Sequence, residues 1–274
     1  MRTIRHATKI VGVLLTATVM QACSDGYDAP SAPTDVARNG ATAAAAAPRI
    51  LRAIGASGTI SDDVAQLQGL LGATLNATPD GADPNGRREI NWDAVPPALT
   101  NTDAFPGDFF NATDPAAPAG RKRGAIFTTA GTGLRVSDND FNDVNPTYGA
   151  QFNFFSPVRT FSSVGSNVLD VLFQVPGTDT PALVNGFGAI FSDVDRVLTT
   201  KLEYYDASNR RIGVVFAPRR TDANGHSVAG IVYTDKVVAR VRMTLGNAAL
   251  GPNESSTRDA VIVDDFLYGE PRAR

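Results

Sequence analysis

The chain has 274 residues, of which 43% are hydrophobic and 19% charged, and its formal net charge at pH 7 is −3. The hydrophobic content is too high for a disordered protein, while 25 glycines and 17 prolines argue against a helical bundle or a coiled coil. The single cysteine excludes a disulfide framework, a cysteine-rich zinc site and an iron–sulfur cluster, because each needs several thiolates.

Residues 1–22 have the features of a signal peptide. Arg2, Arg5 and Lys9 precede an apolar run over residues 10–20. This run is shorter than the roughly 20 residues that a membrane-spanning helix needs. We therefore predict that the segment directs export and is removed.

Cys23 stands at the expected cleavage site and resembles the lipidated cysteine of a bacterial lipobox. Met20 and Gln21 differ from the Leu and the small residue that usually precede that cysteine. Ser24 resembles the pattern that is sorted to the outer membrane. We predict a cell-envelope lipoprotein, anchored to the outer membrane only through its lipid; a periplasmic or secreted protein is the alternative.

Residues 23–49 are rich in Ala, Pro, Ser, Thr, Asp and Gly, and predict a disordered tether. Loss of residues 1–22 removes three basic side chains and no acidic one, which lowers the net charge from −3 to −6. No basic face with interleaved aromatic residues is evident, so nucleic acid is not an expected partner. This charge suits a neutral ligand or a cation. The basic run Arg121-Lys122-Arg123, flanked by glycines, predicts a solvated loop.

Residues 50–86 predict one short helix and a linker. Ser61, Asp62 and Asp63 precede apolar residues at helical spacing, and Gly72 ends the pattern. The Asp and Gly clusters at 80–86 are typical of turns.

Residues 87–274 predict an all-β domain. Leu169, Val171, Phe173 and Val175 alternate with Asp170, Leu172 and Gln174, as in a half-buried strand. About ten short strands without intervening helices indicate an antiparallel two-sheet β-sandwich. The other strands are expected at 89–92, 125–129, 134–137, 151–155, 184–191, 201–206, 211–217, 227–233, 237–245 and 260–268.

The segments 186–195, 202–206, 238–243 and 262–269 resemble exported bacterial proteins of the PEP-CTERM type. The resemblance covers residues 87–270. It implies a jelly-roll sandwich similar to carbohydrate-binding modules and galactose-binding-like domains, and hence a binding function rather than a reaction. The sequence given ends at Arg274 without a Pro-Glu-Pro motif, so a lipid at Cys23 would serve as the anchor instead.

Few residues suit catalysis. His226 follows Gly225 in a predicted loop, so we expect it to be an ordinary surface residue. A Ser-His-Asp triad is the alternative, but no Gly-x-Ser-x-Gly motif accompanies the histidine. Asp193 and Asp195 would share one face of a strand, and a glycosidase needs two carboxyls about 5–10 Å apart. We expect this pair to end a strand at a solvated loop, with ligand binding or hydrolysis as the alternatives.

Asp264 and Asp265 are adjacent within an apolar strand, so we expect them to face opposite sides and one of them to be buried. A buried carboxylate is costly unless it is paired. Backbone amides or an arginine would satisfy it. The alternative is Ca²⁺, which takes oxygen ligands; the resemblance to jelly-roll modules implies a structural calcium between the first and last strands, with Glu89 or Asp93 as further ligands. The acidic loop 138–143 is expected to be a solvated turn.

Sugar binding would use exposed rings, and the candidates are Trp92 and Tyr205, together with Tyr148 and Tyr233. Trp92, the only tryptophan, is equally compatible with a core position. Arg240 and Arg242 would hydrogen-bond sugar hydroxyls, or else form a charged solvent face. The sequence therefore favours a non-catalytic glycan-binding module over an enzyme. A structural module that binds an envelope or extracellular protein is the first alternative, and a glycan hydrolase is the second.

Overall fold

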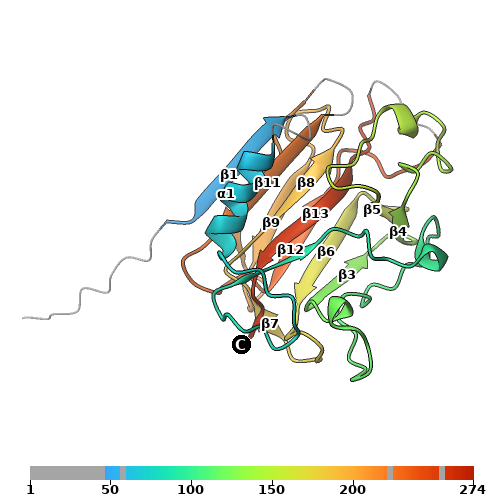
Figure 1. The fold of residues 1–274 in the computed structure, drawn as a ribbon. Helices are drawn as coiled ribbons and strands as arrows, with labels where there is room; N and C mark the ends of the chain where they lie inside the picture. Colours follow the sequence, from blue (N-terminus) through green and yellow to red (C-terminus); the bar gives the residue numbers. More distant parts are fainter. Residues whose placement is uncertain (1–46, 56–59, 221–224, 253–256) are drawn as a thin grey trace, which may run out of the picture. The chain divides into compact units, whose positions relative to one another are not determined.

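A computed structural model describes residues 47–55, 60–220, 225–252 and 257–274 (Figure 1). The predicted signal peptide, Cys23 and nearly all of the predicted tether lie outside the described residues. Among the helices of the described part, none is both long enough and apolar enough to cross a membrane.

The described chain is an antiparallel β-sandwich with one α-helix, as the sequence predicts. The larger sheet has the strand order β1-β11-β8-β13-β5-β4, with β2 also paired to β13, and the smaller has the order β10-β9-β12-β6-β3. Strands β7 and β14 form a separate pair. The element bounds are β1 (Arg49–Gly55), α1 (Ser61–Leu71), β2 (Arg87–Ile90), β3 (Ala125–Thr129), β4 (Gly133–Ser137), β5 (Thr160–Val164), β6 (Val168–Phe173), β7 (Ala182–Leu183), β8 (Gly186–Ser192), β9 (Lys201–Tyr205), β10 (Arg211–Phe216), β11 (His226–Val232), β12 (Arg240–Thr244), β13 (Ile262–Gly269) and β14 (Arg272–Ala273), with single-turn 3₁₀ helices at Pro97–Leu99, Ala119–Arg121 and Tyr148–Ala150.

The main hydrophobic core lies between the two large sheets. Strand β6 alternates as predicted, since Leu169, Val171 and Phe173 are buried in this core and the residues between them are half-buried. From the opposite sheet, β8 and β13 contribute Phe187 and Phe266. Burial of these apolar side chains is the main driving force for folding.

Helix α1 covers the outer face of the larger sheet, in front of β1 and β11 in Figure 1. Leu67 of the helix lies above Gly188 of β8 and Gly230 of β11. A Cβ placed on Gly188 would lie 2.5 Å from Leu67 Cδ2, and one on Gly230 would lie 3.1 Å from Leu67 Cδ1. The two glycines therefore allow the helix to pack close to the sheet, where a second apolar cluster forms.

The sandwich extends further toward the N-terminus than the predicted boundary at residue 87. Strand β1 pairs with β11 over seven residues, so it does not belong to a tether or linker. The short helix predicted after Ser61 is present as α1, and it packs on the sheet. Within β1, Leu51 and Ala53 contribute to the apolar cluster beneath α1, whereas Ile50 is exposed, so the sequence shows no clear alternation there.

Two other strand predictions differ from the structure. Residues 151–155 are not a strand; they cross the outer face of the larger sheet, where the backbone N–H of Asn153 donates to Ser192 Oγ at 2.9 Å. Conversely, β5 was not predicted, because Ser162 and Ser163 disguise a strand whose residues are almost all buried.

Candidate functional site

Strand β13 carries Asp264 and Asp265 at a β-bulge. Between Val263 and Phe266 its pairing with β8 shifts register, so that β13 has one residue more than its partner. The bulge breaks the strict alternation of faces, which corrects the expectation that the two carboxylates point to opposite sides. Ser156 Oγ lies 3.0 Å from an oxygen of Asp264 and 2.8 Å from an oxygen of Asp265.

Asp264 is fully buried within this group. Its carboxylate accepts a hydrogen bond of 2.7 Å from the backbone N–H of Phe155. Burial, and secondly the charge of Asp265, raise the pKa of Asp264 well above its usual range; burial also raises the pKa of Asp265. The Ser156 hydroxyl has one proton, so it donates to one of the two carboxylates at a time.

Glu89 and Asp93, the other two predicted calcium ligands, lie near this pair. Burial is the largest cause of the raised pKa of Asp265, and the negative charges of Glu89 and Asp93 raise this pKa further. Glu89 is paired with Arg87 at 2.6 Å, and Asp93 accepts a hydrogen bond of 2.7 Å from the backbone N–H of Val158. In the part of the chain that the structure describes, no group of three or more His, Cys, Asp or Glu side chains is arranged to hold a metal ion. Calcium at these residues stays a prediction.

Trp92 belongs to the core and is only 1% exposed. Its ring stacks on Phe161, with centroids 4.0 Å apart and planes 9° apart, and its edge contacts include Phe110 and Phe266. The indole N–H donates to the backbone carbonyl of Asp264 at 2.6 Å. Trp92 therefore links the segment after β2 to the bulge of β13 through a hydrogen bond. Because its ring is buried, a sugar cannot stack on it.

Tyr205, Arg240 and Arg242 lie on the smaller sheet. The guanidinium of Arg240 lies 3.8 Å from the centroid of the Tyr205 ring, so it covers one face of that ring. Arg240 and Arg242 both pair with Asp170, at 2.6 and 2.7 Å. This arrangement fits the charged solvent face that the sequence left open as the alternative to a sugar site.

Asp193 and Asp195 directly follow the last residue of β8, which agrees with the expected end of a strand at a loop, so they do not share one face of an extended strand. Asp193 has a positive φ of 67°, and the backbone N–H of Asp195 donates to Asp259 at 3.4 Å. Asp195 lines a separate hollow together with Arg196, Val197 and Arg219.

His226 is fully buried at the start of β11, which corrects its placement in a surface loop. Its Nε2 lies 3.1 Å from the carbonyl oxygen of Asn153, and its ring meets Phe155 edge-on at 5.9 Å. Burial lowers the pKa of His226. The residue packs beneath the segment that reaches Asp264.

A cleft of about 250 Å³, which no pattern in the sequence predicts, opens beside β2. One wall is the end of β2 with residues 91–96, and the other is the loop 109–123. The loop is held in shape by its own backbone: Phe110 accepts a hydrogen bond of 2.7 Å from Arg123 N–H, and Ala112 N–H donates to Arg121 at 2.9 Å. The lining residues are Glu89, Ile90, Asn91, Trp92, Ala94, Pro96, Phe109, Phe110, Pro118, Gly120, Arg121 and Arg123.

The two arginines of the cleft are each anchored by a hydrogen bond from Nε to a backbone carbonyl of their own loop. Arg121 Nε donates to the carbonyl of Phe109 at 3.3 Å, and its guanidinium lies 4.4 Å from the centroid of the Phe109 ring. Arg123 Nε donates to the carbonyl of Gly120 at 3.3 Å. Lys122 does not line the cleft; its Nζ donates to the carbonyl of Pro115. The run predicted to be a solvated loop therefore places two cations in a cleft.

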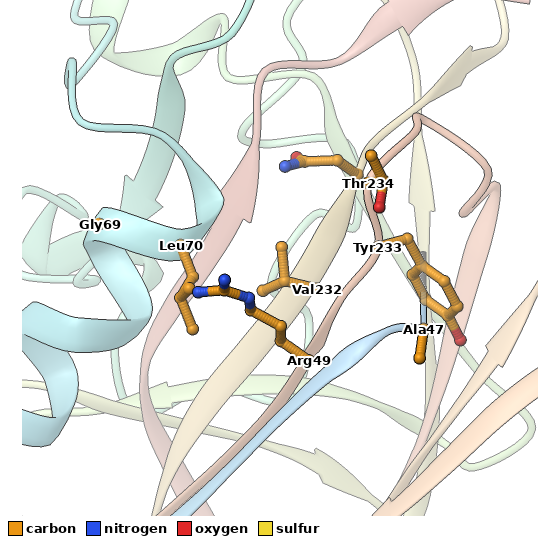
Figure 2. A pocket seen from close by; sticks show the side chains of 8 residues that line it. Ala47, Arg49, Gly69, Leu70, Val232, Tyr233 and Thr234 are labelled. Atoms are coloured by element: carbon orange, nitrogen blue, oxygen red, sulfur yellow. The ribbon is translucent and has the colours of Figure 1, made fainter. Parts of the chain in front are cut away.

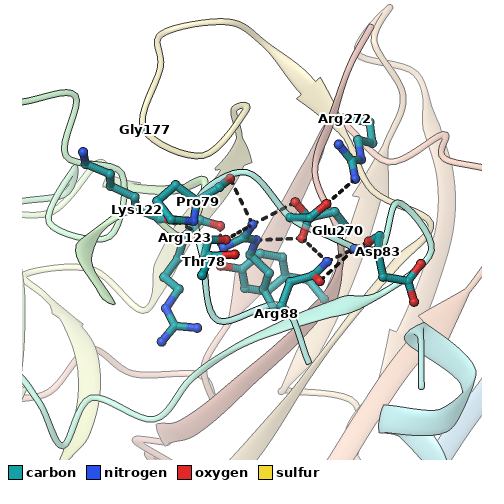
Figure 3. Close-up of polar contacts among 12 residues, drawn as sticks. Thr78, Pro79, Asp83, Arg88, Lys122, Arg123, Gly177, Glu270 and Arg272 are labelled. Atoms are coloured by element: carbon teal, nitrogen blue, oxygen red, sulfur yellow. Dashed lines mark hydrogen bonds and ion pairs between the residues drawn. The ribbon is translucent and has the colours of Figure 1, made fainter. Parts of the chain in front are cut away.

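A buried ion pair holds the other end of β2 (Figure 3). Arg88 contacts Glu270 through two hydrogen bonds, of 2.7 and 2.9 Å, and both side chains are almost fully buried. Arg88 also donates to the carbonyl of Thr78 at 2.8 Å, and Asn76 donates to Glu270 at 2.9 Å. Figure 3 shows Arg123 pointing away from this network. The Arg88–Glu270 ion pair thus holds β2, which forms one wall of the cleft, to the residue that follows β13.

A larger hollow of about 400 Å³ lies between α1 and the ends of β1 and β11 (Figure 2). Figure 2 shows Arg49 extending across it toward Leu70. Among the described residues that line it, Arg49 is the only charged one and Tyr233 the only aromatic one. Ligand sites usually combine apolar walls with several converging polar groups, and the cleft beside β2 fits that description better.

No family model, curated protein or solved structure matches the chain. The resemblance to PEP-CTERM-type proteins and the jelly-roll connectivity stay predictions.

Proposed function

We propose that the protein is a non-catalytic binding module of the cell envelope, and that its ligand, a glycan, occupies the cleft beside β2. The observation that carries the proposal is the composition of the cleft. Proline and phenylalanine walls meet polar groups from two separate segments, and the buried aromatic cluster around Trp92 forms a rigid base. Such walls suit the C–H faces of a sugar ring, and the polar groups suit its hydroxyls.

The size of the cleft supports a small binding unit. Its volume of about 250 Å³ lies just below the roughly 300–1,000 Å³ of sites for drug-sized ligands. One or two sugar rings at the end of a longer glycan would fit such a space. This proposal moves the ligand site away from Tyr205, Arg240 and Arg242, which make contacts with one another and with Asp170.

Two glycine substitutions test where the ligand binds. A Cβ added at Gly120, in the cleft, or at Gly69, in the hollow beside α1, would meet no atom within 4 Å. Gly120→Phe should therefore fill the cleft, and Gly69→Phe should fill the other hollow, without a clash near the backbone. The measurement is binding of the purified protein to a panel of soluble glycans, by array and then by calorimetry.

We expect Gly120→Phe to abolish glycan binding and Gly69→Phe to leave it unchanged. The reverse result would place the ligand in the hollow beside α1. If the unsubstituted protein binds no glycan, the proposed function is wrong, and a protein partner in the envelope becomes the better proposal.

The envelope location rests on residues 1–23 of the sequence, where a basic start and an apolar run precede Cys23. Metabolic labelling with a clickable palmitate analogue tests it. We expect label on the wild-type chain and none on Cys23→Ala; label that persists in the variant would exclude Cys23 as the anchor.

A further inference from the structure

The cleft beside β2 presents two guanidinium groups whose terminal nitrogens are free to bind a ligand. Arg121 and Arg123 each use Nε on a backbone carbonyl of their own loop. Neither terminal pair of nitrogens makes a hydrogen bond with any residue that the structure describes. The planar fork formed by these nitrogens matches a carboxylate, which accepts two parallel hydrogen bonds.

The positive charge of these arginines is not neutralised within the described chain. Neither Arg121 nor Arg123 has a carboxylate within 4 Å among the described residues, whereas Arg240, Arg242 and Arg211 on the smaller sheet all do. Glu89 also lines the cleft, but Arg87 neutralises it and Gln68 donates to the same oxygen at 2.9 Å. The net electrostatic character of the cleft is therefore positive, in a chain whose overall charge is negative.

We infer that the cleft selects a uronic acid, that is, a sugar that carries a carboxylate, and that Arg121 and Arg123 bind this carboxylate. The inference rests on the proposed function. Hydrogen bonds to charged groups are stronger than those to neutral groups, so one carboxylate would dominate selectivity. The apolar walls of Pro96 and Pro118 would contact the sugar ring. Two cations in a cleft of this size match a single anionic unit, whereas the negative chain would repel an extended polyanion such as nucleic acid.

The test compares uronic acid oligosaccharides with their neutral counterparts on the full-length protein. The probes are the trisaccharides of galacturonate, mannuronate and glucuronate, each also in its carboxyl-reduced form, with binding measured by isothermal titration calorimetry. Arg121→Ala/Arg123→Ala removes both cleft cations. Arg49→Ala/Arg52→Ala is the matched control, because it removes two exposed arginines of β1, at the far edge of the sheet.

We expect at least one uronide to bind at least ten-fold more tightly than its reduced form. Arg121→Ala/Arg123→Ala should weaken that binding at least ten-fold, and Arg49→Ala/Arg52→Ala less than two-fold. Arg121→Lys/Arg123→Lys keeps both charges but loses the forks, so its affinity should lie between those of the wild type and the alanine variant. The alanine variant also loses the contact between Arg121 and the Phe109 ring, which could disturb the loop. The lysine variant keeps a cation at both positions, so stronger binding by it than by the alanine variant would show that the positive charge contributes to affinity.

Two failures can be told apart. If a reduced sugar binds as tightly as its uronide, and Gly120→Phe abolishes both, carboxylate recognition is wrong while the cleft remains a glycan site. If neither form of any trisaccharide binds, both the inference and the proposed function fail. A sulfated trisaccharide without carboxylates that binds as tightly as the uronides would overturn selection for a carboxylate.

Discussion

At the scale of single residues, Asp140 makes the clearest prediction about pH. One of its oxygens is buried without a hydrogen-bond partner among the described residues, and burial raises its pKa to about 6. The folded-state pKa of Asp140 lies above the ordinary 3.8, so folding favours the protonated carboxyl. The contribution of Asp140 to stability is therefore fully present below pH 3.8 and is lost as the pH rises through about 6.

Asp140→Asn should therefore increase the free energy of unfolding by about 1–2 kcal/mol at pH 7 and change it little at pH 3.5. The gain is smaller than the full pKa shift implies, because solvent screens this half-buried carboxyl. Urea unfolding at the two pH values measures the difference. An equal change at both would show that titration of Asp140 is not the cause.

The buried pair of Arg88 and Glu270 predicts a large cost for removing one charge. Glu270→Gln would leave the Arg88 guanidinium buried without its counter-ion, and we expect a loss of about 3–5 kcal/mol in urea unfolding. Arg210→Ala is the control, because Arg210 is 78% exposed in its pair with Asp206; it should cost less than about 1 kcal/mol. A small effect of Glu270→Gln would mean that water reaches Arg88 in the variant.

At the scale of elements, the packing of α1 depends on two glycines of the sheet. Gly188→Val would push against Leu67 of the helix, and overpacking of this kind costs about 1–3 kcal/mol. Gly69→Ala, on the exposed side of α1, should instead stabilise by up to about 1 kcal/mol. Thermal unfolding of both variants tests the helix–sheet contact; an unchanged melting temperature for Gly188→Val would contradict it.

Elements with strong periodicity were predictable from the sequence, and those with mixed composition were not. The alternation in 168–175 gave β6 correctly because each apolar residue faces the main core. The strand at 184–191 was also predicted, and Gly186 and Gly188 within it hold a further signal, because alternate glycines on one face indicate close approach of another element. The bulge at Asp264 is not visible in sequence, because it depends on register with β8.

For the candidate site residues too, only features that follow from local sequence patterns could be predicted. Proximity of Glu89 and Asp93 to Asp265 agrees with the idea that early and late strands meet. The position of Arg121 and Arg123 in a cleft, without a carboxylate within 4 Å among the described residues, could not be predicted, because it depends on how distant segments fold together. Trp92 was ambiguous, since a lone tryptophan in a strand pattern is compatible with both a core and a surface position.

At the scale of the whole molecule, the predicted calcium site can be tested by stability. An ion that binds only the folded state at 100 times its Kd stabilises by about 2.7 kcal/mol. If Asp264, Asp265, Glu89 and Asp93 bind Ca²⁺, the melting temperature should rise by several degrees in millimolar Ca²⁺ relative to EDTA, and Asp265→Asn should remove the rise. Equal melting temperatures in both buffers would show that these carboxylates are purely structural.

Trp92 gives the molecule a built-in optical reporter. It is the only tryptophan in the chain, so all indole fluorescence comes from one position. That position lines the cleft, stacks on Phe161 in the core and donates to the backbone of Asp264. Ligand entry, a change in the charge of the carboxylate pair and loss of the core would therefore each alter the emission of a single fluorophore, and titrations with sugar, acid and urea can be followed in one unlabelled sample.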